Sequence, residues 1–116
     1  MARRTSNSSL RAEIRGISSQ INGLKGRIAN YENAKREIDN TVTKLKSIRN
    51  SLNDKSKFSS ARASSISGEA TDAIVELGAS KGSINTQISQ LRSQISGLES
   101  QIERLEREIR QNELEI

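Results

Sequence analysis

The residue types best suited to chemistry lie near the C-terminus, where carboxylates and guanidinium groups alternate. The carboxylates are those of Glu103, Glu106, Glu108, Glu113 and Glu115, and the guanidinium groups are those of Arg104, Arg107 and Arg110. An acid–base or metal site typically also uses His or Cys, and the chain has neither. Opposite charges three and four residues apart are instead typical of a solvated, salt-bridged helix face. The sequence therefore predicts no catalytic residues, no metal and no cofactor, and we do not expect an enzyme.

These side chains must be positioned by long helices, because apolar residues repeat every seven positions along both halves of the chain. The N-terminal half carries Leu10, Ile17, Leu24, Tyr31, Ile38, Leu45 and Leu52, with Ile14, Ile21, Ile28 and Val42 interleaved. The C-terminal half carries Ile74, Leu77, Ile84, Ile88, Leu91, Ile95, Leu98, Ile102 and Leu105. Spacings of three and four residues place these side chains on one narrow side of a helix, here called the seam. Such a narrow stripe needs a facing helix rather than a globular core.

The boundaries of the helices follow from the absence of proline and from a polar interruption. The chain has no Pro, which allows helices far longer than the average of about 11–12 residues. Residues 53–65 break the apolar pattern and are rich in Ser. We predict an all-α fold, a single antiparallel, coiled-coil-like two-helix hairpin over residues 1–116, with helices at 9–52 and 63–115, a turn at 53–62 and the tip within 53–68. Ser9 is the expected N-cap of the first helix.

The formal net charge of +5 hides a difference between the two ends of the chain. Basic residues dominate the first third, whereas glutamates dominate the segment from Glu99 to Ile116. Folding the chain back near its middle brings these segments together, which favours antiparallel pairing. The residues expected to face one another are Arg11, Arg15, Lys25 and Arg27 on one side and Glu99, Glu103, Glu106 and Glu108 on the other. Lys35, Lys81 and Asn112 occupy seam positions, where polar residues fix helix register or partner number and lower stability.

Nucleic-acid binding and membrane insertion are disfavoured by the same sequence. A nucleic-acid surface concentrates its cations on one face or adds aromatic residues for stacking. Here the cations are spread, and the aromatic residues are Tyr31, in the seam, and Phe58. No run of about 18 apolar residues is present, so no membrane-spanning helix is expected. We expect a cytoplasmic protein whose basic residues pair with acidic helices.

Phe58 marks the predicted tip, where it is the single Phe of the chain and stands among Lys and Ser residues. Two roles are open to it. It could close the apolar end of the seam as a plug, or it could be an anchor presented to a partner, as aromatic residues are at many protein interfaces.

Three segments carry a resemblance to a known family. The first segment begins with Ile17-Ser18-Ser19-Gln20-Ile21 and ends with Ala34-Lys35-Arg36-Glu37-Ile38-Asp39. The second is Lys57-Phe58-Ser59-Ser60-Ala61-Arg62-Ala63, and the third extends from Ser83 to Glu99. In these segments the chain resembles the YwqH-like proteins, a branch of the ESAT-like (Trp-Xaa-Gly) helical hairpins of type VII secretion that is encoded beside LXG toxins in Gram-positive bacteria. The resemblance implies that Phe58 and Ser60 are partner-binding tip residues, standing where the family carries Trp and Gly.

Two departures from the family pattern shape what the resemblance implies. The tip lacks both Trp and Gly, and the export signal of Tyr, three residues and an acid is absent, because Lys35 follows Tyr31 at that spacing. The resemblance therefore implies a non-enzymatic adaptor or chaperone-like targeting protein. Such a protein binds the helical LXG domain of a toxin, or a sibling small helical protein, and supports export of the toxin, with or without leaving the cell beside it.

The residues themselves leave two further classes open. One is a structural coiled coil that associates with copies of itself, as a homodimer or a larger assembly, and has no secretion role. The other, which the spread of the cations favours least, is a basic protein associated with nucleic acid.

Overall fold

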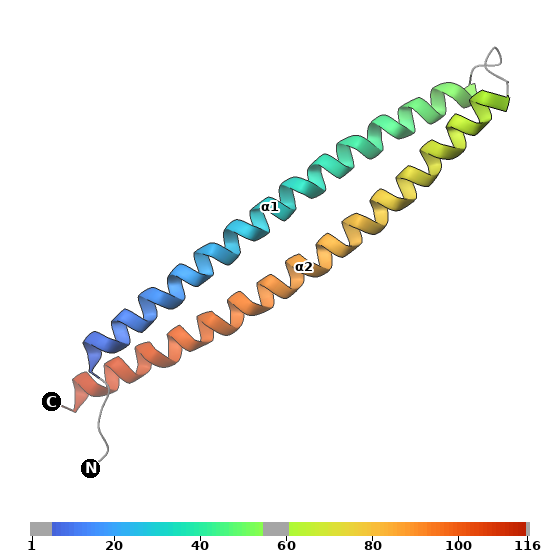
Figure 1. Ribbon diagram of the computed structural model, residues 1–116. Coiled ribbons are helices and arrows are strands. Elements are labelled where there is room, and N and C mark those ends of the chain that lie inside the picture. The colour runs from blue at the N-terminus through green and yellow to red at the C-terminus, as the bar shows by residue number, and fades with distance from the viewer. Residues whose placement is uncertain (1–5, 55–60, 116) are drawn as a thin grey trace. The chain divides into compact units, whose positions relative to one another are not determined.

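The computed structural model describes residues 6–54 and 61–115 of the chain. These residues form helix α1, Asn7–Asp54, and helix α2, Ala61–Leu114, with no strand in the described part (Figure 1). The helices pack against each other in antiparallel directions, because Arg11 contacts Glu113 and Arg49 contacts Thr71. The prediction of an all-α helical hairpin is confirmed.

The N-terminal end of α1 is capped by Ser6. Its hydroxyl oxygen accepts a hydrogen bond from the backbone N–H of Ser9 at 3.1 Å, and its carbonyl accepts one from Leu10 at 3.0 Å. These two bonds define an N-cap, so the prediction of Ser9 as the cap is wrong. Several serines stand before the seam, and any of them could cap a helix. Helix α1 therefore begins at Asn7 instead of the predicted residue 9. Helix α2 also begins two residues earlier than predicted, at Ala61 instead of residue 63.

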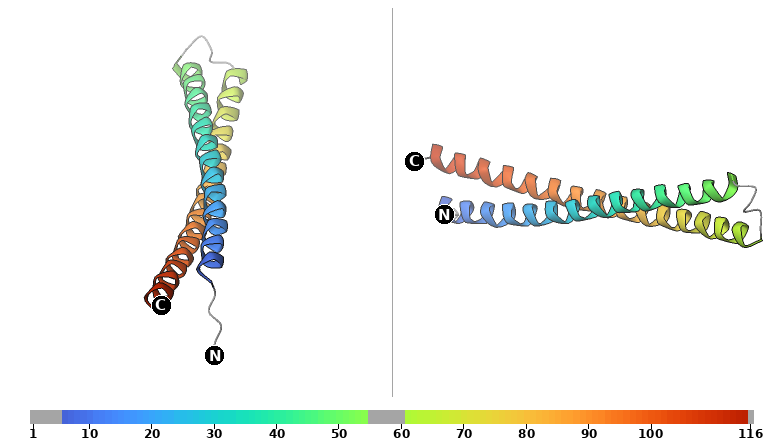
Figure 2. Two further views of the ribbon diagram at one scale, coloured as in Figure 1. Left: turned by 90° about the vertical axis from the view of Figure 1, so that its left-hand side faces the viewer. Right: turned by 90° about the horizontal axis from the view of Figure 1, so that it is seen from above.

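The chain divides into two compact units, and each contains a part of both helices. Unit 1 is Met1–Ala29 with Ile88–Ile116, and unit 2 is Asn30–Gln87. The views of Figure 2 agree that α1 and α2 lie side by side in unit 1. The buried residues that the structure describes in this unit are Leu10, Ile17, Ile21, Ile88, Leu91, Ile95 and Ile109. At its centre Ile17, Ile21 and Ile95 form one cluster, which is extended by Leu24, Ile28, Leu98, Ile102 and Leu105. Unit 1 therefore has a cluster of large apolar side chains contributed by both helices.

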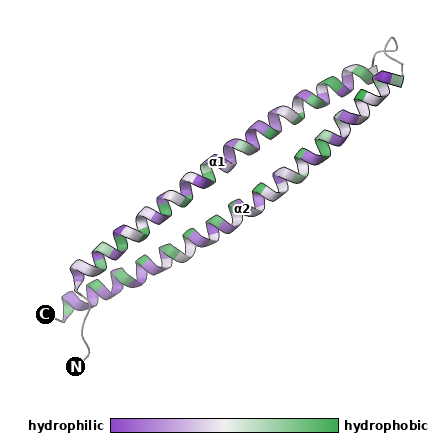
Figure 3. Ribbon diagram, viewed as in Figure 1, coloured by the Kyte–Doolittle hydropathy of each residue, from purple (hydrophilic) through white to green (hydrophobic). Residues whose placement is uncertain are grey.

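Unit 2 buries small residues instead of large ones. Among its described residues the buried ones are Ala63 and Ala70. Its larger seam side chains are only half-buried, namely Tyr31, Ile38, Val42, Leu45, Leu52, Ile74, Leu77 and Ile84. Three large apolar side chains among these described residues are exposed, Ile48 by 50%, Ile66 by 41% and Val75 by 66%. Apolar and polar residues alternate along both helices in Figure 3. The seam of unit 2 is therefore incompletely covered by the chain itself.

Candidate functional site

The residues predicted for the seam lie where the two helices meet. Each of the sixteen is buried or half-buried: Leu10, Ile17, Leu24, Tyr31, Ile38, Leu45, Leu52, Ile74, Leu77, Ile84, Ile88, Leu91, Ile95, Leu98, Ile102 and Leu105. Near the start of α2, Ala63 and Ala70 are buried, whereas Ile66 is exposed. The tip residues Phe58 and Ser60 lie outside the described residues, so their proposed role as partner contacts stays a prediction.

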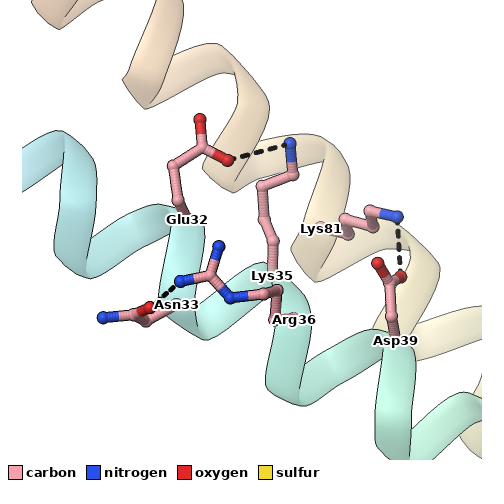
Figure 4. A network of polar contacts seen from close by, with 6 residues as sticks. All are labelled: Glu32, Asn33, Lys35, Arg36, Asp39 and Lys81. Atoms are coloured by element: carbon pink, nitrogen blue, oxygen red, sulfur yellow. Dashed lines mark hydrogen bonds and ion pairs between the residues drawn. The ribbon is translucent and has the colours of Figure 1, made fainter.

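The two lysines in the seam of unit 2 direct their ammonium groups toward carboxylates at its edge (Figure 4). Lys81 Nζ lies 2.6 Å from Asp39 Oδ1 across the two helices, and Lys35 Nζ lies 3.7 Å from Glu32 Oε2 within α1. The side chains of the lysines are 35% and 24% exposed, respectively. Their aliphatic stems can therefore cover apolar surface while the charges stay hydrated. Beside them, Arg36 donates a hydrogen bond to the side-chain oxygen of Asn33.

Replacing Asp39 with asparagine should lower the free energy of unfolding by about 0.2–1 kcal/mol, because it removes the charge that faces Lys81. The loss should shrink as salt is added, since the pair is partly exposed. Urea denaturation followed by circular dichroism at two salt concentrations measures both effects. Glu37→Gln is the matched control, because Glu37 is exposed and forms no ion pair with a residue that the structure describes. Equal effects of the two substitutions would show that the contact between Asp39 and Lys81 contributes nothing.

The charged pair that joins the helices in unit 1 differs from the predicted set. Arg11 Nη2 lies 3.1 Å from Glu113 Oε1, closer to the C-terminal end than the glutamates expected to face the basic residues. Next to this pair, Asn112 Nδ2 donates a hydrogen bond to Asn7 Oδ1 at 3.0 Å. The polar seam residue Asn112 is thus satisfied by an amide at the start of α1. No ion pair is found for Arg15, Lys25 or Arg27, all within the described residues.

An open groove with a largely apolar surface lies between the helices of unit 1, and we call it the glycine groove. Its volume is about 550 Å³, and it is lined by Gln20, Gly23, Leu24 and Arg27 of α1 and by Gln94, Gly97, Leu98 and Gln101 of α2. A Cβ atom added at Gly23 or Gly97 would meet nothing within 4 Å. The groove therefore has open space beside both glycines, and its lining includes the half-buried Leu24 and Leu98.

A second open groove, the acidic groove, also lies between the helices of unit 1. Its volume is about 350 Å³, and it is lined by Ser18, Ile21, Asn22 and Lys25 of α1 and by Glu99, Ile102, Glu103 and Glu106 of α2. On each helix the spacing of the lining residues places them on the flank of the seam opposite the glycine groove. Its three carboxylates and one ammonium group give this groove a net negative charge. Neither groove was predicted from the sequence.

Both grooves are open, and each is lined by residues of both helices. Among the described residues no group of three or more potential ligands could hold a metal ion. None of the described helical segments is long and apolar enough to cross a membrane. In comparisons with known proteins, no family model, curated sequence or solved structure matches the chain.

Proposed function

We propose that this chain is a non-enzymatic adaptor that contributes its two helices to a helical bundle with a helical partner protein. On the sequence resemblance, the partner is the helical LXG domain of a type VII secretion toxin, alone or with a sibling small helical protein, and the adaptor supports export of the toxin. The tip residues Phe58 and Ser60 are proposed as further contacts with this partner.

The observation that supports this proposal is the incomplete covering of the seam in unit 2. Ile48 belongs to a helical row with Leu45 and Leu52, and all three side chains are half-buried or exposed. On α2, Ile66 likewise begins a row with Ala70, Ala73 and Leu77. A partner helix laid along these rows would remove their apolar surface from water, at about 25 cal/mol per Å². In an isolated hairpin this apolar surface stays in contact with water.

Co-purification with the products of neighbouring genes tests the proposal. A tagged chain should capture an LXG-type protein that is encoded beside it, and deletion of the chain should stop export of that protein. Replacing both Ile48 and Ile66 with glutamate should abolish capture, because two charges would enter the apolar contact. The helix content of this variant, measured by circular dichroism, should stay near that of the wild type.

The matched control is Val75→Glu. Val75 is also exposed, but it lies nine residues after Ile66, on the opposite side of α2, where Thr71, Gly78 and Gly82 are its neighbours. This variant should still capture the partner. The secretion role is wrong if no LXG reading frame neighbours the gene, and the proposed contact is wrong if the double variant captures as well as the control does. A polymer of the chain alone, seen by light scattering, would favour the structural coiled coil instead.

A further inference from the structure

Two rows of charged and polar residues, one on each helix, run along the side of unit 1 that contains the acidic groove, and part of each row lines the groove. The row on α1 has the spacing of successive helical turns and consists of Arg11, Arg15, Ser18, Asn22 and Lys25. The row on α2 repeats the same spacing and consists of Glu99, Glu103, Glu106, Arg110 and Glu113. The first row carries only positive charges and the second mostly negative ones. One molecule therefore displays two complementary charged edges.

Among the described residues of one chain, an ion pair joins these two edges at one end. Arg11 bonds to Glu113, but Lys25 forms no ion pair with any described residue, although it lines the same groove as Glu99 and Glu103. Arg15 is exposed and likewise has no ion pair within the described part of the chain. The remaining charges of both rows are thus available to a second molecule that presents the opposite charge at the same spacing.

We propose that the acidic groove of unit 1 binds the same groove of a second copy of this chain, in a twofold-symmetric dimer. In this dimer α1 of each copy runs antiparallel to α2 of the other, and a symmetry axis parallel to the helices relates them. Each basic row faces an acidic row, and Ile21 and Ile102 of the groove lining are covered. The dimer goes beyond the proposed adaptor role, because it uses a different groove and a different occupant.

The positions of the charged residues along the helix axes fit this arrangement. Arg11 and Glu113 stand at one level, because they are bonded. Counting equal numbers of residues from that pair along both helices places Lys25 level with Glu99, and Arg15 within one turn of Glu106. A symmetry axis parallel to the helices keeps these levels, so Lys25 of one copy meets Glu99 of the other. Both intermolecular contacts occur twice in the dimer.

Reversing the charge of either row alone tests the dimer. One variant carries Arg15→Glu and Lys25→Glu, and the other carries Glu99→Lys, Glu103→Lys and Glu106→Lys. In sedimentation experiments the wild type should be a dimer at about 0.05 M salt and dissociate toward monomer at about 0.5 M. Each variant alone should raise the dimer dissociation constant at least about tenfold, because like charges then face each other. An equimolar mixture of the two variants should form a dimer again, since each row then meets its opposite.

Two controls separate association from folding. Arg27→Glu changes a charge on the flank of the glycine groove and should leave the dimer unchanged. The milder variant Arg15→Gln with Lys25→Gln adds no repulsion, should keep the helix content of the wild type, and should still weaken the dimer. A wild type that is monomeric at low salt, reversed variants that dimerise as the wild type does, or a mixture that stays monomeric would overturn the proposal. The adaptor role would survive each of these results, because capture of a helical partner is measured separately.

Discussion

Replacing Ile95 with alanine should lower the free energy of unfolding by about 2–4 kcal/mol. Ile95 is 8% exposed and belongs to the central cluster of unit 1 with Ile17 and Ile21. Truncation removes buried methyl and methylene groups and leaves a space between two helices that can close only partly. The described residues include six other large buried side chains, so one such loss removes a large share of their apolar burial.

Chemical denaturation at low temperature, followed by circular dichroism, measures the effect of Ile95→Ala. Val75→Ala is the control, because Val75 is 66% exposed and its truncation should change the free energy of unfolding by no more than about 0.5 kcal/mol. If both substitutions cost the same, the cluster around Ile95 does not form in solution. A variant that loses its helix content before any denaturant is added agrees with the prediction.

Replacing Gly16, Gly26, Gly78 and Gly82 together with alanine should raise the free energy of unfolding by about 2–4 kcal/mol. All four glycines lie inside helices, where alanine is better by about 0.5–1 kcal/mol each. A Cβ atom at each position would meet nothing within 4 Å, and no described glycine has a positive φ. Neither a steric clash nor backbone strain therefore opposes the gain, which comes mainly from the unfolded chain.

Thermal unfolding of the four-alanine variant should show a melting temperature well above that of the wild type. Gly23 and Gly97 are left unchanged in this variant, because they line the glycine groove and their replacement would also alter that surface. Proline at Gly16 is the opposing control, since it removes a helical hydrogen bond and should cost about 3 kcal/mol. An unchanged melting temperature in the four-alanine variant would mean that these positions are not helical in solution.

The heptad spacing of apolar residues predicted the helices and the seam, because a period of three and four residues has no other simple structural explanation in a chain without proline. It did not predict how deeply each seam residue is buried. Tyr31 and Leu45 follow the pattern as well as Ile17 does, yet they stay half-buried. Depth depends on the facing side chain, and in unit 2 that side of the seam includes Lys81 and small alanines.

The partners of charged residues were harder to predict from the sequence than the positions of the apolar seam residues. The sequence predicted that a basic edge faces an acidic edge. Which residues form ion pairs depends on shifts of about one helical turn, and the structure pairs Arg11 with Glu113. The N-cap was missed for a similar reason, because Ser6 and Ser9 are chemically identical and only the backbone distinguishes them. The grooves arise from the shape of two packed helices, which a linear pattern does not contain.

Unit 1 pairs the two ends of the sequence, so its formation requires closing a longer loop, at a higher entropic cost, than the formation of unit 2. The contact between Arg11 and Glu113 spans 102 positions of the chain, whereas that between Arg49 and Thr71 spans 22. In an unfolded chain, closing the longer loop costs about 1.4 kcal/mol more in entropy. The large aliphatic core thus occurs where loop closure is most costly, and the alanine contacts occur where it is least costly. A segment with short-range contacts can form quickly with little burial, while the distant ends need strong packing to stay together.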